Sequence, residues 1–390
     1  MTAELNSSQL AAARTFFAQR QDKNLKLIRR LVECESPSGD AEGSSAVVQL
    51  LAELSGNIAA IDSFERLPSP GYGEHLRIRA FGGQNGKGTT LLLGHTDTVH
   101  PVGAVNCSNP IRTDGDLFFG PGIFDMKAAC VLAVEVLRCL EALSLTPARP
   151  VTLLLTCDEE TGSLTGRPLV EQESRRAAQV LVLEPPGQGG CVKTARKGVG
   201  MWTIEAQGIA SHAGLNPEAG ASAILELARQ TQRLHSFSDP ESNTSFNVGI
   251  VRGGTRSNVV AAQAEIEIDV RFSTAEEARR VEELMNTLRP FDERVQLKVK
   301  GGINRAPLER TPAVVRLFEQ AREIAALLGF DLNELSAGGA SDGNFAAALN
   351  VPVLDGLGID GDGAHAAYEH IIVSDIPRRG ALLAGLVATL

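Results

Sequence analysis

The sequence predicts an α/β protein, in which a domain with a mostly parallel sheet is interrupted by a smaller inserted α+β domain. The chain has 390 residues and a mass of 41.3 kDa, and at about 150 residues per domain this length favours two or three domains. Apolar strands alternate with amphipathic helices in the first half and again near the end, which is typical of a parallel sheet covered by helices. Between these parts the strands alternate apolar and polar residues, as in a sheet with one face in water.

The first part of the larger domain is predicted to span residues 1–195. The spacing of Leu, Ile and Val indicates helices near the N-terminus, over about 24–33 and 43–54. A long helix is predicted over residues 127–143. Short apolar runs bounded by polar or glycine-rich loops predict the strands, which are residues 89–93, 151–156 and 180–183.

The inserted domain is predicted at residues 196–303. Its elements follow the order strand, helix, strand, strand, helix, strand, which is that of ferredoxin-like domains. In chain order they are residues 199–207, 217–234, 245–251, 263–272, 274–288 and 295–300. Residues 304–390 are predicted to complete the larger domain, with a helix at about 313–328 and a strand at 351–354.

Charge and hydropathy exclude two classes of partner. Lys and Arg number 37 and Asp and Glu number 47, so the net charge is −10 and the pI about 5.3, without the basic excess needed to bind nucleic acid. No run approaches the roughly 18 apolar residues of a membrane span, and the first residues contain no continuous apolar segment after a basic one. The six cysteines form no C-x-x-C pair and indicate reduced thiols. We therefore expect a soluble, cytoplasmic protein that binds neither nucleic acid nor a membrane.

Residues able to bind a metal follow the predicted strands of the larger domain. They are His95 and Asp97 after the first strand, Glu159 and Glu160 after the second, Glu184 after the third, His365 in the glycine-rich loop after the last, and Asp125 just before a helix. Open α/β sheets bind ligands beyond the carboxyl ends of their strands. Clustered carboxylates repel one another unless cations lie among them. Imidazole and carboxylate ligands without cysteine suit zinc, with Co²⁺ or Mn²⁺ as substitutes.

Four short motifs occur in order along the chain. They are GHTDTV at 94–99, GPG through DMK at 120–127, DEETG at 158–162 and SHAG at 211–214. In these motifs the chain resembles the zinc-dependent exopeptidase and deacylase family that contains glutamate carboxypeptidase (carboxypeptidase G), acetylornithine deacetylase, succinyl-diaminopimelate desuccinylase and aminoacylase. The resemblance covers nearly the whole chain, and SGDAEG at 38–43 is most similar to the glutamate carboxypeptidase branch.

The resemblance implies a co-catalytic dizinc site in the larger domain, with two Zn²⁺ per subunit. It implies that Asp125 bridges the two ions. The other ligands are His95 and Glu184 at one ion, and Glu160 and His365 at the other.

The resemblance also implies roles for three residues that bind no metal. Glu159 is the general base, which takes a proton from the attacking water and delivers it to the leaving amine. Asp97 orients the imidazole of His95. His212 of the inserted domain reaches the active site of the partner subunit and stabilises the oxyanion, so we expect a homodimer formed through the inserted domain. Glu159 and Glu160 are expected in extended backbone, where successive side chains point opposite ways.

An exopeptidase of this kind must recognise the free C-terminal carboxylate of a small-molecule or peptide substrate. The planar fork of arginine suits a carboxylate. The candidates are Asn258 and Arg271, which stand where the family places carboxylate-binding groups, and Arg305 at the end of the inserted domain. The histidines outside the motifs are expected to be exposed or bonded locally, and these are His75, His100, His235 and His370.

The leading hypothesis is a dizinc metallocarboxypeptidase that hydrolyses the amide bond to a C-terminal amino acid, with glutamate favoured. Its substrates are folate-like, N-acyl or peptide compounds. The alternative with the same chemistry is an N-acyl-amino-acid deacylase similar to acetylornithine deacetylase. A catalytically silent metal-binding homologue is a third hypothesis, disfavoured because all five implied ligands and Glu159 are present.

Overall fold

The computed structural model describes residues 6–84 and 86–390, which form two compact units. Unit 1 consists of Met1–Ala195, Arg310–Ala337 and Ser341–Leu390, and unit 2 of Arg196–Glu309 and Gly338–Ala340. The catalytic role of the first and the dimerisation role of the second stay predictions. Within the described residues, the helices are too short or too polar to cross a membrane.

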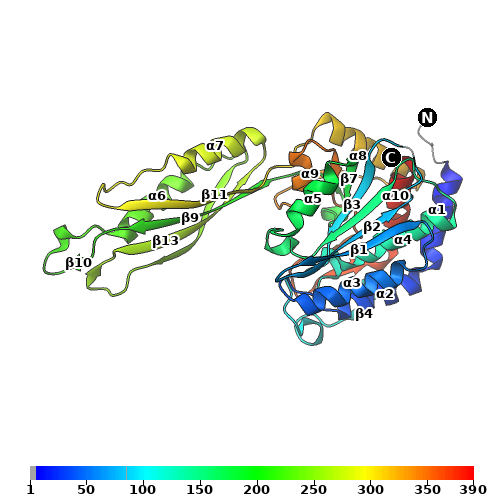
Figure 1. The fold of residues 1–390 in the computed structure, drawn as a ribbon, viewed down its shortest axis with the longest axis horizontal. Coiled ribbons are helices and arrows are strands. Elements are labelled where there is room, and N and C mark those ends of the chain that lie inside the picture. The colour runs from blue at the N-terminus through cyan, green and yellow to red at the C-terminus, as the bar shows by residue number, and fades with distance from the viewer. Residues whose placement is uncertain (1–5, 85) are drawn as a thin grey trace. The chain divides into compact units, whose positions relative to one another are not determined.

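Unit 1 is built on a six-stranded sheet (Figure 1). The strand order is β1-β2-β6-β3-β7-β16, and only β2 runs against the others, so the predicted mostly parallel sheet is confirmed. The strands are β1 (Ile61–Ser69), β2 (Gly73–Ala80), β3 (Thr89–His95), β6 (Val151–Thr156), β7 (Ala177–Val182) and β16 (Val353–Leu354).

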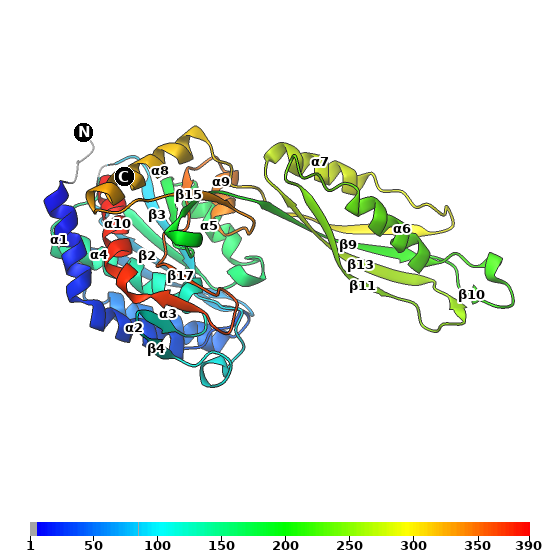
Figure 2. The same cartoon turned by 180° about the vertical axis from the view of Figure 1, so that it is seen from behind.

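Helices cover both faces of this sheet (Figure 1 and, from behind, Figure 2). Every residue of β6 is buried, which requires cover on both faces, because successive side chains of a strand point to opposite sides. The helices α4 and α5 both contact β3. The helices of unit 1 are α1 (Ser7–Gln19), α2 (Gln21–Glu33), α3 (Ala41–Ser55), α4 (Ala128–Ala142), α5 (Gly166–Ser174), α8 (Pro312–Leu327), α9 (Gly343–Ala348) and α10 (Ile376–Thr389).

A second, small sheet of unit 1 joins two loops that lie far apart in the sequence. Its order is β17-β18-β5-β4, and β18 pairs with β5 so that His370 lies opposite Phe119. The strands are β4 (Arg112–Asp114), β5 (Leu117–Phe119), β17 (Gly361–Asp362) and β18 (His370–Ile372). The loop that carries His365 is thereby held beside the loop that carries Asp125. A pair of short strands, β8 (Val192–Arg196) and β15 (Glu334–Ala337), completes the unit.

Unit 2 has a four-stranded antiparallel sheet with the order β11-β13-β9-β14. Buried and less buried residues alternate along β13, as expected of a sheet with one covered face. Along the chain the elements follow the predicted ferredoxin-like order. They are β9 (Gly198–Gln207), α6 (Ala223–His235), β11 (Ser245–Gly253), β13 (Gln263–Phe272), α7 (Ala275–Asn286) and β14 (Gln296–Arg305), with two short paired strands, β10 (Ser211–His212) and β12 (Val259–Val260).

The first helix of unit 2 begins later than predicted. Residues Pro217–Ala219 form only a short 3₁₀ turn, and α6 begins at Ala223, where the Ser222 hydroxyl accepts a hydrogen bond from the backbone of the first turn. The intervening Ala221 forms a β-bridge with Ile209, which holds it in an extended conformation. The predicted helix start at residue 217 is therefore overridden by pairing of Ala221 with a residue earlier in the chain.

Candidate metal centre

Acidic and histidine side chains of unit 1 gather where three neighbouring strands end. β3 ends at His95, β6 leads into the 3₁₀ turn Glu159–Thr161 (η3), and β7 leads to Glu184. Asp125 comes from the segment Ile123–Lys127, which precedes α4. The three strands run parallel to one another, so their carboxyl ends meet at one edge of the sheet.

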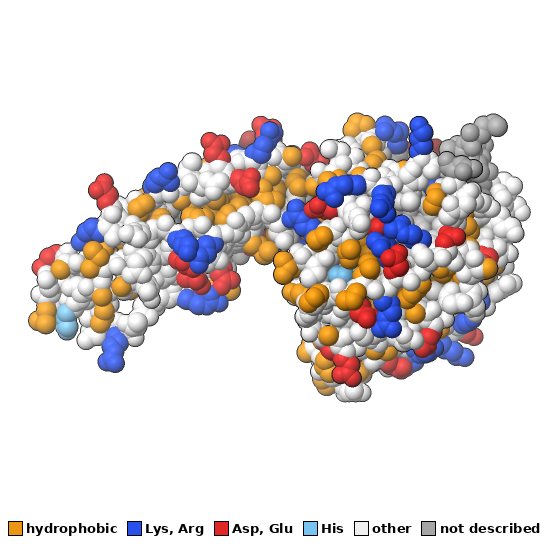
Figure 3. Space-filling model, in the orientation of Figure 1, with side chains coloured by type: hydrophobic (Ala, Val, Ile, Leu, Met, Phe, Trp, Pro, Cys, Tyr) orange, Lys and Arg blue, Asp and Glu red, His pale blue; other side chains and the backbone are white. Residues whose placement is uncertain are grey.

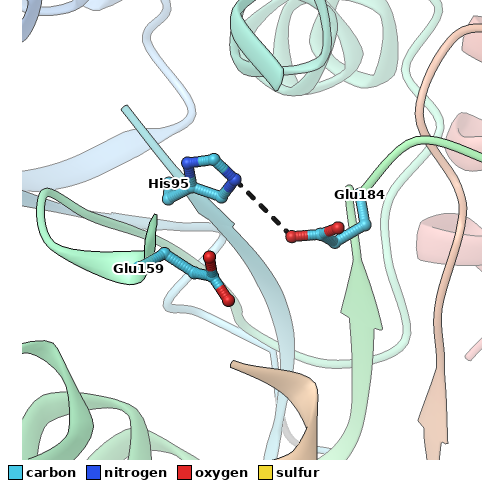
Figure 4. A group of neighbouring side chains, drawn as sticks. All are labelled: His95, Glu159 and Glu184. Atoms are coloured by element: carbon cyan, nitrogen blue, oxygen red, sulfur yellow. Dashed lines mark ion pairs between the residues drawn. The ribbon is translucent and has the colours of Figure 1, made fainter. Parts of the chain in front are cut away.

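The buried imidazole of His95 is the centre of a first group (Figure 4). Its Nε2 lies 3.1 Å from Asp125 Oδ1 and 3.5 Å from Glu184 Oε1. Glu159 reaches toward the same space, and ligand atoms of His95, Glu159 and Glu184 all lie within 4.8 Å of one another. Such spacing allows one ion to contact several of these side chains.

A second group shares Asp125 with the first. His365 Nε2 lies 3.4 Å from Asp125 Oδ2 and 3.3 Å from Glu160 Oε2. The two oxygens of Asp125 therefore face different histidines, with Oδ1 toward His95 and Oδ2 toward His365. The His365 side chain is 53% exposed and that of His95 only 1%, so the group opens to solvent on the His365 side.

The carboxylates and imidazoles shift one another's pKa values when no cation lies between them. Hydrogen bonds with Asp125 and Glu160 raise the pKa of His365 to about 10. Burial lowers the pKa of His95, but the surrounding carboxylates, Asp125 first among them, outweigh burial and raise it well above its usual value. Burial raises the pKa of Asp125, yet the two histidines outweigh it and hold the pKa far below its usual value. A metal ion must therefore displace protons from the imidazoles when it binds.

One oxygen of the group has no protein partner. Glu160 Oε1 is buried and accepts no hydrogen bond from any described residue. Burial raises the pKa of Glu160, because the charged form loses its hydration. A buried carboxylate oxygen without a hydrogen bond is costly, and a bound cation would compensate for it. Imidazole and carboxylate donors without thiolate suit zinc, so the residues present fit a divalent metal ion.

Asp97 connects His95 to the turn that carries the two glutamates. His95 Nδ1 lies 2.9 Å from the Asp97 backbone carbonyl oxygen and 3.4 Å from its carboxylate Oδ1. The carboxylate accepts hydrogen bonds from the backbone N–H groups of Glu159 at 3.2 Å and Glu160 at 3.1 Å. The nearer contact to the imidazole is thus the carbonyl oxygen, and the carboxylate mainly holds the turn η3. That Asp97 orients the imidazole stays a prediction.

The expectation of extended backbone at Glu159 and Glu160 is wrong. Both residues lie in the 3₁₀ turn η3, in which the Gly162 N–H donates to the Glu159 carbonyl at 3.0 Å. With about three residues per turn, successive side chains point about 120° apart rather than opposite ways. They still separate, because Glu159 joins the group around Glu184 and Glu160 joins the group around His365.

In unit 2, Arg271 and Arg305 lie on strands that flank the same residue of β9. Arg271 of β13 and Arg305 of β14 are both paired with Val199. Arg271 is partly exposed and forms an ion pair with Asp269 at 2.7 Å, whereas Arg305 is buried. Lys197 lies close to Arg271. Burial lowers the pKa of Lys197, and the positive charge of Arg271 lowers it further. We did not predict a role for Lys197, although a basic pair just before β9 is a signal for one.

His212 and Asn258 lie at the other end of unit 2. His212 is on β10, which pairs with β12, and Asn258 directly precedes β12; both residues are exposed. The strand β9 ends at Gln207, and Figure 1 shows β10 beyond this end of the strand. Val199 and Gln207 are eight positions apart on β9, which corresponds to about 26 Å at about 3.3 Å per residue. The structure therefore does not bring Asn258 together with Arg271 within one chain.

Two histidines outside the motifs bond to distant residues, so the expectation of exposed or locally bonded rings is wrong for them. His75 is buried, and its Nε2 lies 3.1 Å from Thr165 Oγ1. His100 Nε2 lies 2.6 Å from Glu369 Oε2. Glu369 was not among the predicted site residues, and no local pattern marks it, because its partners come from distant segments. The other two histidines are exposed or bonded locally.

Comparison with known proteins agrees with the motifs. The chain is 30% identical over 382 residues to carboxypeptidase G2 of Pseudomonas sp. (strain RS-16). This alignment covers 94% of this chain and 89% of that protein. It is 26% identical over 373 residues to succinyl-diaminopimelate desuccinylase of Delftia acidovorans, and this alignment covers 91% of this chain and 94% of that protein. The structure of aminopeptidase PepT from Bacillus cereus superposes on this chain with a TM-score of 0.77 at 21% sequence identity. The superposition covers 95% of this chain and 98% of that one, so the two proteins share the fold.

The family itself follows from a match to most of the chain. A family model described as peptidase family M20/M25/M40 matches residues 91–389. The matched residues include all those that surround the candidate metal centre, namely His95, Asp125, Glu159, Glu160, Glu184 and His365. The resemblance inferred from the motifs is therefore confirmed, and the chain belongs to peptidase family M20/M25/M40, a family of metallopeptidases and amidohydrolases.

Proposed function

We propose that this protein is a dizinc metallocarboxypeptidase that hydrolyses the amide bond to a C-terminal amino acid, with a preference for glutamate. The observation that carries the proposal is the position of Asp125, whose two carboxylate oxygens face two different histidines. The similarity to carboxypeptidase G2 over nearly the whole chain supports it. Folate-like, N-acyl and peptide compounds are the proposed substrates.

The proposed cofactor is two Zn²⁺ per subunit, with Co²⁺ or Mn²⁺ as substitutes. Asp125 would contribute to holding both ions, His95 and Glu184 would hold one of them, and Glu160 and His365 would hold the other. The buried Oε1 of Glu160, which accepts no hydrogen bond from the described residues, supports this assignment, because a bound cation would compensate for it.

Replacing either histidine with alanine is expected to lower the zinc content from about two ions per chain towards one, because each loses one of three ligands. Metal analysis of dialysed His95→Ala and His365→Ala measures this. The control is His235→Ala, an exposed histidine of unit 2, which is expected to keep the wild-type zinc content. Two tightly bound zinc ions in both histidine variants would contradict the ligand assignment.

The proposed mechanism is hydrolysis assisted by a general base. Bound zinc supplies Lewis-acid polarisation of the scissile carbonyl and makes the attacking water more acidic. Glu159 takes the proton of that water and transfers it to the nitrogen of the leaving amino acid. Its side chain reaches toward the space between His95 and Glu184, where ligand atoms lie within 4.8 Å of one another. Asp97 keeps the turn that carries Glu159 in place through backbone hydrogen bonds.

The free carboxylate of the substrate is proposed to bind the basic side chains of unit 2. Arg271 and Arg305 flank the same β9 residue, and Lys197 lies close to Arg271. Asp269 compensates one of these three positive charges, and the remaining two favour an amino acid with a second carboxylate in its side chain. Asn258 is proposed to contribute from the other end of unit 2, and hence from a partner subunit.

A substrate panel tests this function. Purified zinc-loaded protein is supplied with folate, an N-acyl-glutamate, N-acetylornithine and N-succinyl-diaminopimelate side by side, and released amino acids are quantified. Release of glutamate from folate or the acyl-glutamate at a kcat/KM at least tenfold above the other substrates is expected. No release of glutamate from either compound would rule out the carboxypeptidase assignment.

A deacylase is the second candidate function. The similarity to succinyl-diaminopimelate desuccinylase over 91% of the chain favours it, and the proposed metal chemistry serves it equally well. In the panel, preferential cleavage of N-acetylornithine or N-succinyl-diaminopimelate would select this function over the first.

Unit 2 is proposed to form a homodimer in which His212 stabilises the oxyanion in the partner's active site. Figure 3 shows hydrophobic side chains along the visible face of unit 2. Exposed apolar residues lie on two adjacent elements, α6 and the edge strand β11, and these are Ile224, Leu225, Ile250 and Val251. An open strand edge beside apolar side chains is suited to self-association.

Light scattering tests the dimer. The wild type is expected to have twice the mass of the chain, and Leu225→Asp with Val251→Lys is expected to yield monomers that lose at least tenfold in kcat, because His212 no longer reaches a partner. A fully active monomer would contradict both the interface and the action of His212 in trans.

A cytoplasmic location is also proposed. All six cysteines are free thiols in the structure, and thiols persist in a reducing compartment.

A further inference from the structure

Glu369 is a buried carboxylate beside the proposed metal centre that the mechanism has not used. Its side chain is 0% exposed. Oε2 accepts a hydrogen bond from the Gly122 N–H at 2.8 Å, and Oε1 accepts from the N–H groups of Phe124 and Asp125, each at 2.9 Å. Three donors of one loop therefore converge on one carboxylate, and the last of them belongs to Asp125 itself.

The loop is shaped to hold an anion. Gly122 has φ of +67°, and a Cβ at this position would lie 2.3 Å from Thr98 Cγ2, so both the conformation and the packing require glycine. Successive N–H groups that point to one side of such a turn form an anion-binding concavity. Here the anion is a glutamate of the chain itself, which comes from a segment more than 240 residues further along.

Glu369 also connects the three segments that carry His95, Asp125 and His365. Glu369 lies in the loop of His365, four residues after it. Its backbone carbonyl accepts from the Gly120 N–H at 3.2 Å, and its Oε2 lies 2.6 Å from Nε2 of His100, in the segment that follows His95. A shift of Glu369 therefore moves the Asp125 loop relative to both histidines.

The partners of Glu369 differ from those of most buried glutamates of unit 1. Glu173 and Glu135, for example, form ion pairs with arginines, which stabilise the fold at a distance from the site. Glu369 instead bonds to backbone N–H groups of the Asp125 loop and to one imidazole. Hydrogen-bond partners of a metal-binding residue fix its orientation, and their loss weakens metal affinity by about 10- to 100-fold.

We propose that Glu369 is a positioning residue of the metal centre, which holds the Gly120–Asp125 loop so that the two carboxylate oxygens of Asp125 face both metal positions at once. The proposal rests on the proposed dizinc function. Glutamate offers two acceptor oxygens at this position, and glutamine offers only one. In either orientation of the amide, the NH₂ group of glutamine therefore faces a backbone donor, which is the Gly122 N–H or the N–H groups of Phe124 and Asp125. The loop must then shift, and Asp125 shifts with it.

The test compares Glu369→Gln with Glu226→Gln, a matched control in unit 2. Glu226 is also a buried glutamate that accepts backbone N–H groups, those of Phe291 and Asp292. Zinc affinity is measured by competition with a chromogenic chelator, and the melting temperature of the zinc-free proteins reports the loss of fold stability. We expect Glu369→Gln to bind zinc about 10- to 100-fold more weakly, with activity restored by excess zinc, and Glu226→Gln to bind zinc as the wild type does.

The outcomes separate the two proposals. If the wild type binds two zinc ions and Glu369→Gln binds them equally tightly, the positioning role is wrong and the dizinc function stands. If the wild type binds no zinc, the proposed function itself is wrong. Should Glu369→Gln not fold, Glu369→Asp decides by the same criterion, because it keeps the charge but is too short to reach all three N–H groups. Failure of both variants to fold would show a role in folding instead and would overturn the proposal.

Discussion

Replacing Glu159 with glutamine is expected to lower kcat by about 10²- to 10⁴-fold while both zinc ions stay bound. Glutamine has nearly the size and shape of glutamate but cannot take a proton from water. Steady-state kinetics with the best substrate of the panel, together with metal analysis of the same preparation, measure both quantities.

The metal content of this variant distinguishes a base from a ligand. Ligand atoms of Glu159 lie within 4.8 Å of those of His95 and Glu184, so the geometry alone is compatible with either role. Loss of one zinc ion from Glu159→Gln would indicate a ligand, and near-normal turnover would exclude a general base. The control is Glu171→Gln on α5, which removes a carboxylate that pairs with the exposed Arg167 and Arg175 and is expected to keep full activity.

Removing zinc is expected to destabilise unit 1. Four carboxylates gather at the centre around His95 and His365, and these are Asp125, Glu159, Glu160 and Glu184. A ligand that binds only the folded state stabilises it by about 2.7 kcal/mol when its free concentration is 100 times its Kd. We therefore expect chelation to lower the melting temperature by several degrees, as measured by calorimetry, and added zinc to restore it.

A variant without the bridging carboxylate is the control for chelation. Asp125→Asn is expected to bind zinc weakly, so a chelator changes its melting temperature much less than that of the wild type. An unchanged wild-type transition after proven loss of zinc would contradict a stabilising role of the metal and the ligand assignment that rests on it.

The candidate metal centre was predictable in residue type because each of its residues stands beside an element with a clear pattern. His95 and Glu184 stand at the ends of apolar strands whose pattern predicts a buried parallel sheet. The carboxyl ends of parallel strands meet at one edge of the sheet, so the two side chains were expected to lie close together. His365 lies in a glycine-rich loop after the last predicted strand, and the resemblance implied its role as a ligand. The structure places it beside Asp125 through the pairing of β18 with β5, which no local pattern indicates.

Predictions about local backbone failed where distant contacts decide the conformation. Glu159 and Glu160 lie in a 3₁₀ turn instead of an extended segment, and the carboxylate of Asp97 accepts hydrogen bonds from both of their N–H groups. Ala221 is held extended by Ile209, which delays the start of α6. In both cases the competing partner lies outside the window from which a local propensity is read.

The amino-acid sequence alone determined the fold class, the ferredoxin-like order of elements in unit 2 and the family, because hydrophobic periodicity and short motifs are local properties of the chain. Only the tertiary structure showed that Asp125 faces two histidines, that Glu369 accepts hydrogen bonds from the loop of Asp125, and that Asn258 and Arg271 lie toward opposite ends of unit 2. Those facts depend on side chains and backbone groups that meet across as many as 269 residues, and the chain must fold before they become neighbours.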